Sequence, residues 1–208
     1  MSFATYVDYQ DWSGTTVAVD KRARMDLLLS IASDLIRDHC GWHIAPVRSE
    51  TKRLSGRGGP VITLPSLEVT AVANVKWADR RLAEPFVIDP ANYQWSRNGV
   101  IQLDVSTYPW WLEWTAEFPV YYAEGFADGL DNFTVEFTHG FAAAPAVVKH
   151  VACDMVSIAI ASTVSAVPGV KRESKTTGNI SVSFDYGQAV GQLRLGSDHK
   201  EILSRFTL

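Results

Sequence analysis

One stretch of the chain restricts the fold more than any other: an alternating strand that leads through a tight turn into a long helix. Residues 133–139 alternate strictly between apolar and polar side chains, which predicts a strand with one buried and one exposed face. Gly140 opens the turn, and Pro145 suits the first position of a helix that we expect from Ala146 to about Val164. Sheet and helix therefore belong to one α+β fold.

A second long helix is expected before the strands. Asp20 is a suitable N-cap for a helix that runs to about Cys40, where Gly41 ends it. Its apolar residues share one face at helical spacing and are Met25, Leu28, Ile31, Ala32, Leu35 and Ile36. The helix from Ala146 is apolar on more than one side, so we expect part of it to need a further partner.

Between the two long helices the pattern changes to that of strands. The expected strands cover residues 48–54, 61–64, 69–77, 93–97, 100–103, 112–122 and 133–139. Asn98 and Gly99 lie between two of them and are the strongest hairpin signal in the chain. The last two strands are expected to pair with each other. We therefore expect a β-rich inserted region over residues 48–139.

The remaining residues are expected to form a small helical bundle with two extensions. Residues 1–19 lack periodicity and are interpreted as a loose N-terminal arm. Residues 20–47 and 140–208 form the helical core, which contains two long helices and a short C-terminal helix. Ser197 and Asp198 open that last helix, with Glu201 three residues after Asp198 as in a capping box. An extended hairpin arm over residues 169–187 leaves this core.

Composition and charge exclude several classes of protein. The chain is 47% hydrophobic and 20% charged, as is ordinary for a globular protein, and its formal charge of −4 argues against a general nucleic-acid binder. The N-terminus has no signal-peptide pattern. The most apolar window, residues 146–164, carries Lys149, His150 and Asp154, which favours a protein-facing helix over a membrane span. Cys40 and Cys153 are interpreted as buried free thiols.

No motif in the sequence predicts an enzyme, a cofactor or a metal centre. His39 and His43 have a ligand spacing, but Gly41 breaks the helix between them and no third ligand lies nearby. The glycine-rich residues 56–59 lack the features of a phosphate loop and are interpreted as a turn. A cluster of three tryptophans leaves one alternative open, a ligand- or carbohydrate-binding surface at Trp110, Trp111 and Trp114.

Taken in order, these pieces resemble the head–tail connector (adaptor, or head-completion) proteins of long-tailed double-stranded-DNA bacteriophages. The resemblance covers roughly residues 20–206. It is carried by residues 20–40, 64–65 leading into 69–77, 93–103, 133–141 with Pro145 and its helix, 169–186, and a closing helix that ends near Phe206. The long, Trp-rich residues 107–130 depart from the compact family pattern.

The resemblance implies a structural virion protein without enzymatic activity. Proteins of this family form a ring, usually a dodecamer, beneath the portal, where they extend the DNA channel and dock the stopper and the tail. The implied partners are thus other copies of the chain, the portal and the stopper or tail proteins. DNA passes through without sequence-specific binding, and no membrane is involved. The implied location is the neck of the virion, after synthesis in the host cytoplasm.

Carried onto this chain, the resemblance implies two sets of contact residues. The portal-binding residues are expected in the arm and are Val170, Lys171, Arg172, Lys175, Ile180, Val182, Phe184 and Tyr186. The ring-interface residues are expected on the two long helices and are Leu28, Leu35, Val148, Val151, Met155 and Ile158. Two alternatives stay open: another neck or tail-completion protein, such as a stopper or terminator, and a carbohydrate-binding β module that uses the Trp cluster.

Overall fold

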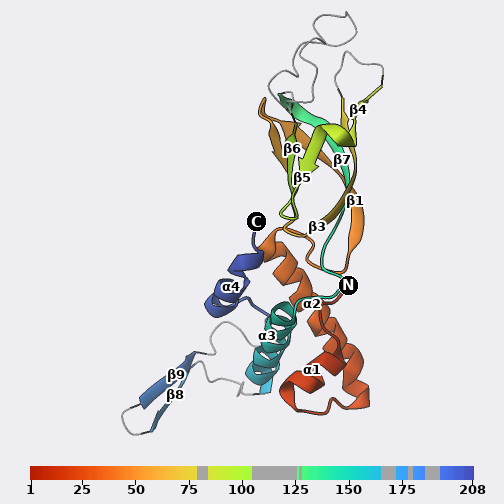
Figure 1. Ribbon diagram of the computed structural model, residues 1–208. Coiled ribbons are helices and arrows are strands. Elements are labelled where there is room, and N and C mark those ends of the chain that lie inside the picture. Colours follow the sequence, from red (N-terminus) through yellow and green to blue (C-terminus); the bar gives the residue numbers. More distant parts are fainter. Residues whose placement is uncertain (79–83, 105–125, 127, 165–171, 178–179, 186–192) are drawn as a thin grey trace, which may run out of the picture. The chain divides into compact units, whose positions relative to one another are not determined.

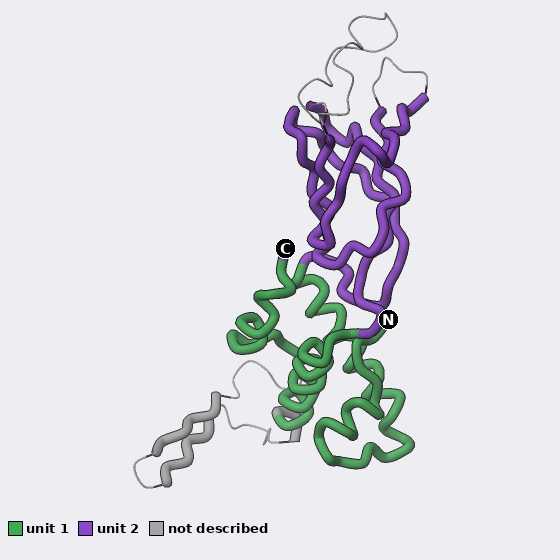
Figure 2. The backbone as a smooth tube through the Cα atoms, viewed as in Figure 1, with its two compact units in different colours: residues 1–40, 144–207 green, residues 41–143, 208 purple. Residues whose placement is uncertain are grey.

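The computed structural model describes residues 1–78, 84–104, 126, 128–164, 172–177, 180–185 and 193–208 (Figure 1). The described chain is α+β and divides into two compact units, which Figure 2 colours separately. The helical unit comprises Met1–Cys40 and Ala144–Thr207. The β unit comprises Gly41–Ala143 together with Leu208.

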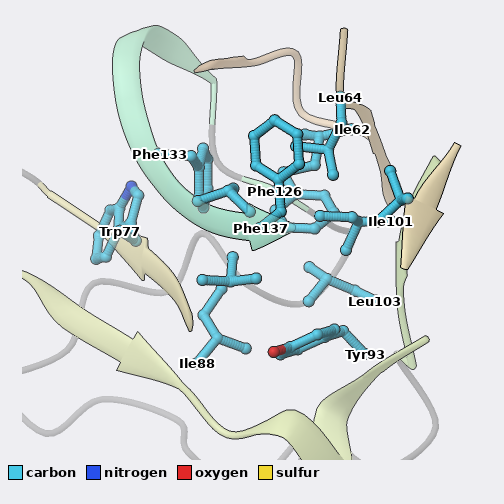
Figure 3. Close-up of a cluster of buried hydrophobic side chains, with 13 residues drawn as sticks. Ile62, Leu64, Trp77, Ile88, Tyr93, Ile101, Leu103, Phe126, Phe133 and Phe137 are labelled. Atoms are coloured by element: carbon cyan, nitrogen blue, oxygen red, sulfur yellow. The ribbon is translucent and has the colours of Figure 1, made fainter. Parts of the chain in front are cut away.

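The predicted helical bundle with a β-rich insertion is wrong. Among the described residues of the β unit, seven strands form two sheets that enclose a hydrophobic core of their own. Figure 3 shows side chains of both sheets gathered in this core, for example Ile101 and Phe137. Each sheet has an apolar face that needs cover, and the two sheets cover one another. The β unit is therefore a core in its own right and not an appendage of a bundle.

Four α-helices and two short 3-10 turns make up the described secondary structure of the helical unit, apart from a two-stranded hairpin. They are α1 (Tyr6–Ser13), η1 (Val19–Lys21), α2 (Arg22–Cys40), α3 (Ala146–Val164), α4 (Ser197–Leu203) and η3 (Ser204–Phe206). The predictions for the two long helices, α2 and α3, are confirmed. Helix α3 packs against α1, α2 and α4, so its apolar composition on several sides matches neighbours on several sides.

The first nineteen residues are not a loose arm, because they contain α1. Thr5 Oγ1 accepts a hydrogen bond from the Asp8 N–H (3.3 Å), and the Asp8 carboxylate accepts one from the Thr5 N–H (2.8 Å). This reciprocal pair is a capping box, and it satisfies two backbone donors at the start of the helix. Phe3 is buried, and its N–H donates to Ser33 Oγ at 2.8 Å. The segment is thereby anchored on α2.

The buried face of α2 is rotated from the predicted one. The residues it buries are Met25, Leu29, Ala32, Ser33, Ile36 and Cys40. Leu28 and Leu35 are only partly buried, and Ile31 is exposed. A polar residue fits inside because the Ser33 hydroxyl donates to the Leu29 carbonyl at 2.6 Å and accepts from the Phe3 N–H. The hydrophobic pattern of the helix alone does not predict a buried serine whose hydroxyl group is hydrogen-bonded.

The two sheets of the β unit are antiparallel throughout the described strands. The larger has the order β1 (Arg48–Gly56), β7 (Gly129–His139), β3 (Val69–Trp77) and β4 (Phe86–Ile88). The smaller has the order β2 (Val61–Thr63), β6 (Val100–Leu103) and β5 (Tyr93–Trp95), and the turn η2 (Pro90–Asn92) precedes β5. The long strand β7 is central, since it pairs with both β1 and β3.

Several strand predictions are confirmed and others are corrected. The bounds of β3 agree with the prediction, and Asn98 and Gly99 connect the paired strands β5 and β6. Gly99 has a φ of +79°, and an added Cβ would lie 2.5 Å from the Ser66 carbonyl oxygen, so this turn requires glycine. Strand β4 was not predicted, because three residues are too few to show a period. The expected strand 112–122 lies outside the described residues.

The last helix begins with a different cap from the predicted one. Gly196 is the N-cap of α4, and its N–H donates to the Nδ1 atom of His199 at 3.2 Å. The predicted pairing of Asp198 with Glu201 is therefore wrong, although Asp198 lies in the first turn, where a negative charge is favourable.

Candidate functional site

The predicted partner-binding arm contains a two-stranded antiparallel hairpin, β8 (Arg172–Thr177) and β9 (Ile180–Asp185) (Figure 1). Among the described strands, β8 and β9 pair only with each other. Each strand therefore has an outer edge without a described strand beside it. The register opposes Lys175 to Val182, so these two positions share one face of the hairpin.

Five of the eight predicted portal-binding residues lie in this hairpin. They are Arg172, Lys175, Ile180, Val182 and Phe184. Within β9 the three apolar positions fall on one face, because they alternate with serines 181 and 183. Val170, Lys171 and Tyr186 lie outside the described residues.

The predicted ring-interface residues do not form one exposed surface. Val148, Val151 and Met155 of α3 are buried within the helical unit, so they are core residues of this chain. Leu28 and Leu35 are partly buried. Ile158 is 56% exposed. The apolar surplus of α3 is thus covered largely by its own chain. The predicted interface residues also omit Leu27 of α2, an apolar side chain that is 60% exposed.

Polar contacts fasten α1 to α3. Lys149 Nζ donates to Asp8 Oδ1 at 2.8 Å, and Trp12 Nε1 donates to His150 Nδ1 at 2.6 Å. Burial alone would raise the pKa of Asp8, but the hydrogen bonds from Lys149 and Thr5 outweigh it and hold this pKa below its usual value. The carboxylate is therefore charged at neutral pH and serves both the helix cap and the contact between the helices.

The Asp154–His199 pair has the composition of a catalytic dyad but a different role. The Nδ1 atom of His199 accepts from the Gly196 N–H, so the proton is on Nε2, which donates to Asp154 Oδ2 at 2.8 Å. Both ring nitrogens are thus engaged, and the side chain is buried. This histidine joins α4 to α3 and has no free nitrogen with which to act as a base.

A second buried histidine, His139, lies at the end of β7 in the β unit. Its Nε2 lies 3.3 Å from Glu50 Oε1, but neither ring nitrogen makes a hydrogen bond within the described residues. Its ring neighbours are those of Phe137 and His43, at centroid distances of 4.9 and 5.8 Å. Burial lowers the pKa of His139 to about 4, and the carboxylate of Glu50 opposes this shift without reversing it. The imidazole is therefore neutral at pH 7.

The remaining candidate ligands do not assemble into a metal centre among the described residues. No group of three His, Cys, Asp or Glu side chains there is placed to hold an ion. The Nε2 atom of His43 donates to the Pro46 carbonyl oxygen at 2.6 Å, since a carbonyl can only accept. Cys40 and Cys153 are buried free thiols, as predicted. Burial raises the pKa of each thiol to about 11, so neither forms a nucleophilic thiolate at neutral pH.

Two further expectations concern the tryptophan cluster and membranes. Trp110, Trp111 and Trp114 lie outside the described residues, so the carbohydrate-binding alternative stays a prediction. Within the described ranges, none of the helices combines the length and the apolarity that crossing a bilayer requires.

Comparison with known proteins adds one finding. No family model matches the chain, and no curated protein matches it. A function for this chain therefore rests on the geometry of the described residues and on the resemblance in the sequence pattern.

Proposed function

We propose that the protein is a structural subunit of a bacteriophage neck, a head–tail connector (adaptor). In this role, copies of the chain assemble as a ring beneath the portal, extend the DNA channel and dock the stopper and the tail. The hairpin of β8 and β9 engages the portal. The order of helices, strands and arm in the sequence supports this family, and the hairpin is the observation on which the proposal depends.

The hairpin needs a partner for its stability. A lone two-stranded hairpin is marginally stable in water, because it has little apolar surface to bury and leaves backbone groups of both outer edges without strand partners. Strands β8 and β9 have no other strand partner among the described strands. A partner that supplies a strand, or an apolar groove, would stabilise the hairpin on contact. The apolar positions of β9 share one face, as such docking requires.

The charge of the chain agrees with a subunit past which DNA slides. The formal net charge is −4. A negatively charged surface repels the phosphate backbone and does not retain DNA by counterion release. The proposal therefore needs no site for nucleic acid on this protein.

A portal-binding assay tests the role of the hairpin. We expect a variant lacking residues 170–186, closed by a short Gly-Ser linker, to keep its helical circular dichroism but bind portal rings at least about tenfold more weakly. Val182→Pro should have the same direction of effect, because proline removes a backbone donor from β9. Arg57→Asp, an exposed change in the β unit, serves as the control. Normal portal binding by the folded deletion variant would contradict the proposal.

A further inference from the structure

Helix α2 presents a stripe of exposed residues at alternating intervals of three and four. The stripe consists of Arg24, Leu27, Ile31, Asp34 and Asp38, all of them exposed. Leu27 is 60% exposed and Ile31 is 42% exposed. This alternating spacing keeps the five positions on one side of the helix, and it is the spacing through which two helices pack as a coiled coil. The stripe lies away from the buried face of α2, so it is not needed for the core.

The charges of the stripe are arranged to match a second copy of the same helix. Arg24 lies toward the N-terminal end, Asp34 lies toward the C-terminal end, and the two apolar residues lie between them. When a second α2 runs antiparallel, Arg24 faces Asp34 of the second copy, and Leu27 faces Ile31 of the second copy. Both pairings are symmetric about the same residue, Leu29. Each pairing occurs twice in the symmetric dimer, which gives four layers of facing residues, and one register satisfies all four.

The parallel arrangement of two copies is disfavoured by the same residues. It would place Arg24 against Arg24 of the second copy and Asp34 against Asp34 of the second copy. Like charges at facing positions repel, and such repulsion selects between alternative pairings. The charge pattern of α2 therefore specifies the antiparallel orientation as well as the partner.

We propose that the exposed stripe of α2 is a self-recognition surface through which two copies of this chain associate antiparallel. Leu27 and Ile31 form its apolar centre, and an Arg24–Asp34 ion pair between the copies closes it at each end. Such a contact uses the same surface on both copies and is complete with two of them. It cannot by itself propagate into a ring, so the inference is independent of the proposed function.

The neighbours of Asp34 leave it able to make this contact. Its Oδ1 atom accepts a hydrogen bond from Arg37 in the same helix at 2.9 Å, yet the Asp34 side chain remains 65% exposed. The guanidinium of Arg37 stacks over the ring of Phe3, with its central carbon 4.2 Å from the ring centroid. A carboxylate has lone pairs for a second donor. Asp38 lies beyond the matched layers, because its symmetric position, Asp20, precedes α2.

Sedimentation velocity over a range of protein concentrations tests the proposal. The full chain is expected to associate reversibly as a dimer. Arg24→Asp and Asp34→Arg each place like charges in two layers, and each should weaken the dimer at least about tenfold. The double variant should restore it, because the exchanged charges again face each other. An equimolar mixture of the two single variants should also associate, since their charges are complementary. Arg57→Asp, an exposed change of equal charge in the β unit, should leave the dimer unchanged.

Two outcomes would overturn the proposal. One is a wild-type chain that sediments as a monomer at every concentration. The other is a double variant that dimerises as weakly as the single variants, because restored association is the signature of antiparallel pairing. Leu27→Gln provides an independent check if a charge variant loses its circular dichroism. Since Leu27 is exposed, this change should leave the fold intact and weaken the dimer, and an unchanged dimer would count against the proposal.

Discussion

A single buried imidazole makes the stability of the β unit depend on pH. His139 is fully buried, and burial lowers its pKa to about 4 from the usual value of 6.5. The charged and titratable groups that act on it are Glu50, which raises the pKa, and Arg48, His43 and Lys52, which lower it. Between pH 6.5 and pH 4 the unfolded chain binds more protons than the folded one. The stability contributed by the neutral imidazole is therefore present above pH 6.5 and is lost as the pH falls through this window.

Replacement of this histidine tests that dependence. We expect the unfolding free energy of the wild type to fall between pH 7 and pH 5 by about 2 kcal/mol more than that of His139→Phe. The reason is that phenylalanine fills a similar volume beside Phe137 but cannot bind a proton. Urea titrations of both proteins at the two pH values measure the difference. Equal pH dependence of the two proteins would contradict this expectation, because it would mean that folding does not shift the pKa of His139.

The sequence contains part of the information about this residue. In the alternating strand, His139 falls in phase with Phe133, Val135 and Phe137, all of which are buried. Phase therefore predicts an inward position for residue 139. The sequence does not reveal which charges surround it, because Glu50 comes from a distant strand whose register against β7 is a tertiary property. The sequence therefore predicts that His139 is buried but does not predict the charged groups around it.

Among the elements, predictions succeeded where an apolar pattern was long. Helix α3 and strand β3 have the predicted bounds, since α3 is apolar through most of its nineteen residues and β3 carries its strand pattern over nine. Helix α1 was missed because its eight residues carry no apolar stripe. A signal was nevertheless present, because Thr5 and Asp8 have the spacing of a capping box. For short helices, the cap is a better guide than periodicity.

The contribution of that cap is measurable. We expect Thr5→Ala to lower the unfolding free energy of the helical unit by about 1 kcal/mol, because it removes the side-chain acceptor for the Asp8 N–H. Thr16→Ala, at an exposed position outside the helix, is the matched control and should change stability by less than about 0.5 kcal/mol. Thermal unfolding followed by circular dichroism provides the comparison. A loss no larger than that of the control would mean that water replaces the threonine at the cap.

At the scale of the whole molecule, local pattern predicted elements but not which faces meet. The predicted architecture treated the strands as an insertion in a helical bundle. In the structure, β7 pairs with β1 and β3, and the second sheet covers the first. The pairing of β1 with β7 joins residues far apart in sequence, such as Leu54 and Phe133. No local period encodes such a partner, so the closure of two sheets on each other could not be read from the sequence.

A self-contained core has a consequence for the β unit as a separate chain. We expect a fragment of residues 41–143 to fold, because its apolar cluster draws every member from within that range. It should unfold cooperatively in urea, as followed by tryptophan fluorescence, since Trp77 is buried in the cluster. Phe137→Ala should destabilise the fragment by about 3 to 5 kcal/mol through the cavity that it leaves.

The control for this cavity is Val87→Ala on β4. Val87 is 51% exposed, so its truncation should cost less than about 0.5 kcal/mol. A fragment without a cooperative transition would contradict a core that is complete within the β unit, and so would equal effects of the two substitutions. The contrast between a fully buried phenylalanine and a half-exposed valine thus tests whether the two sheets stabilise each other, as their shared cluster implies.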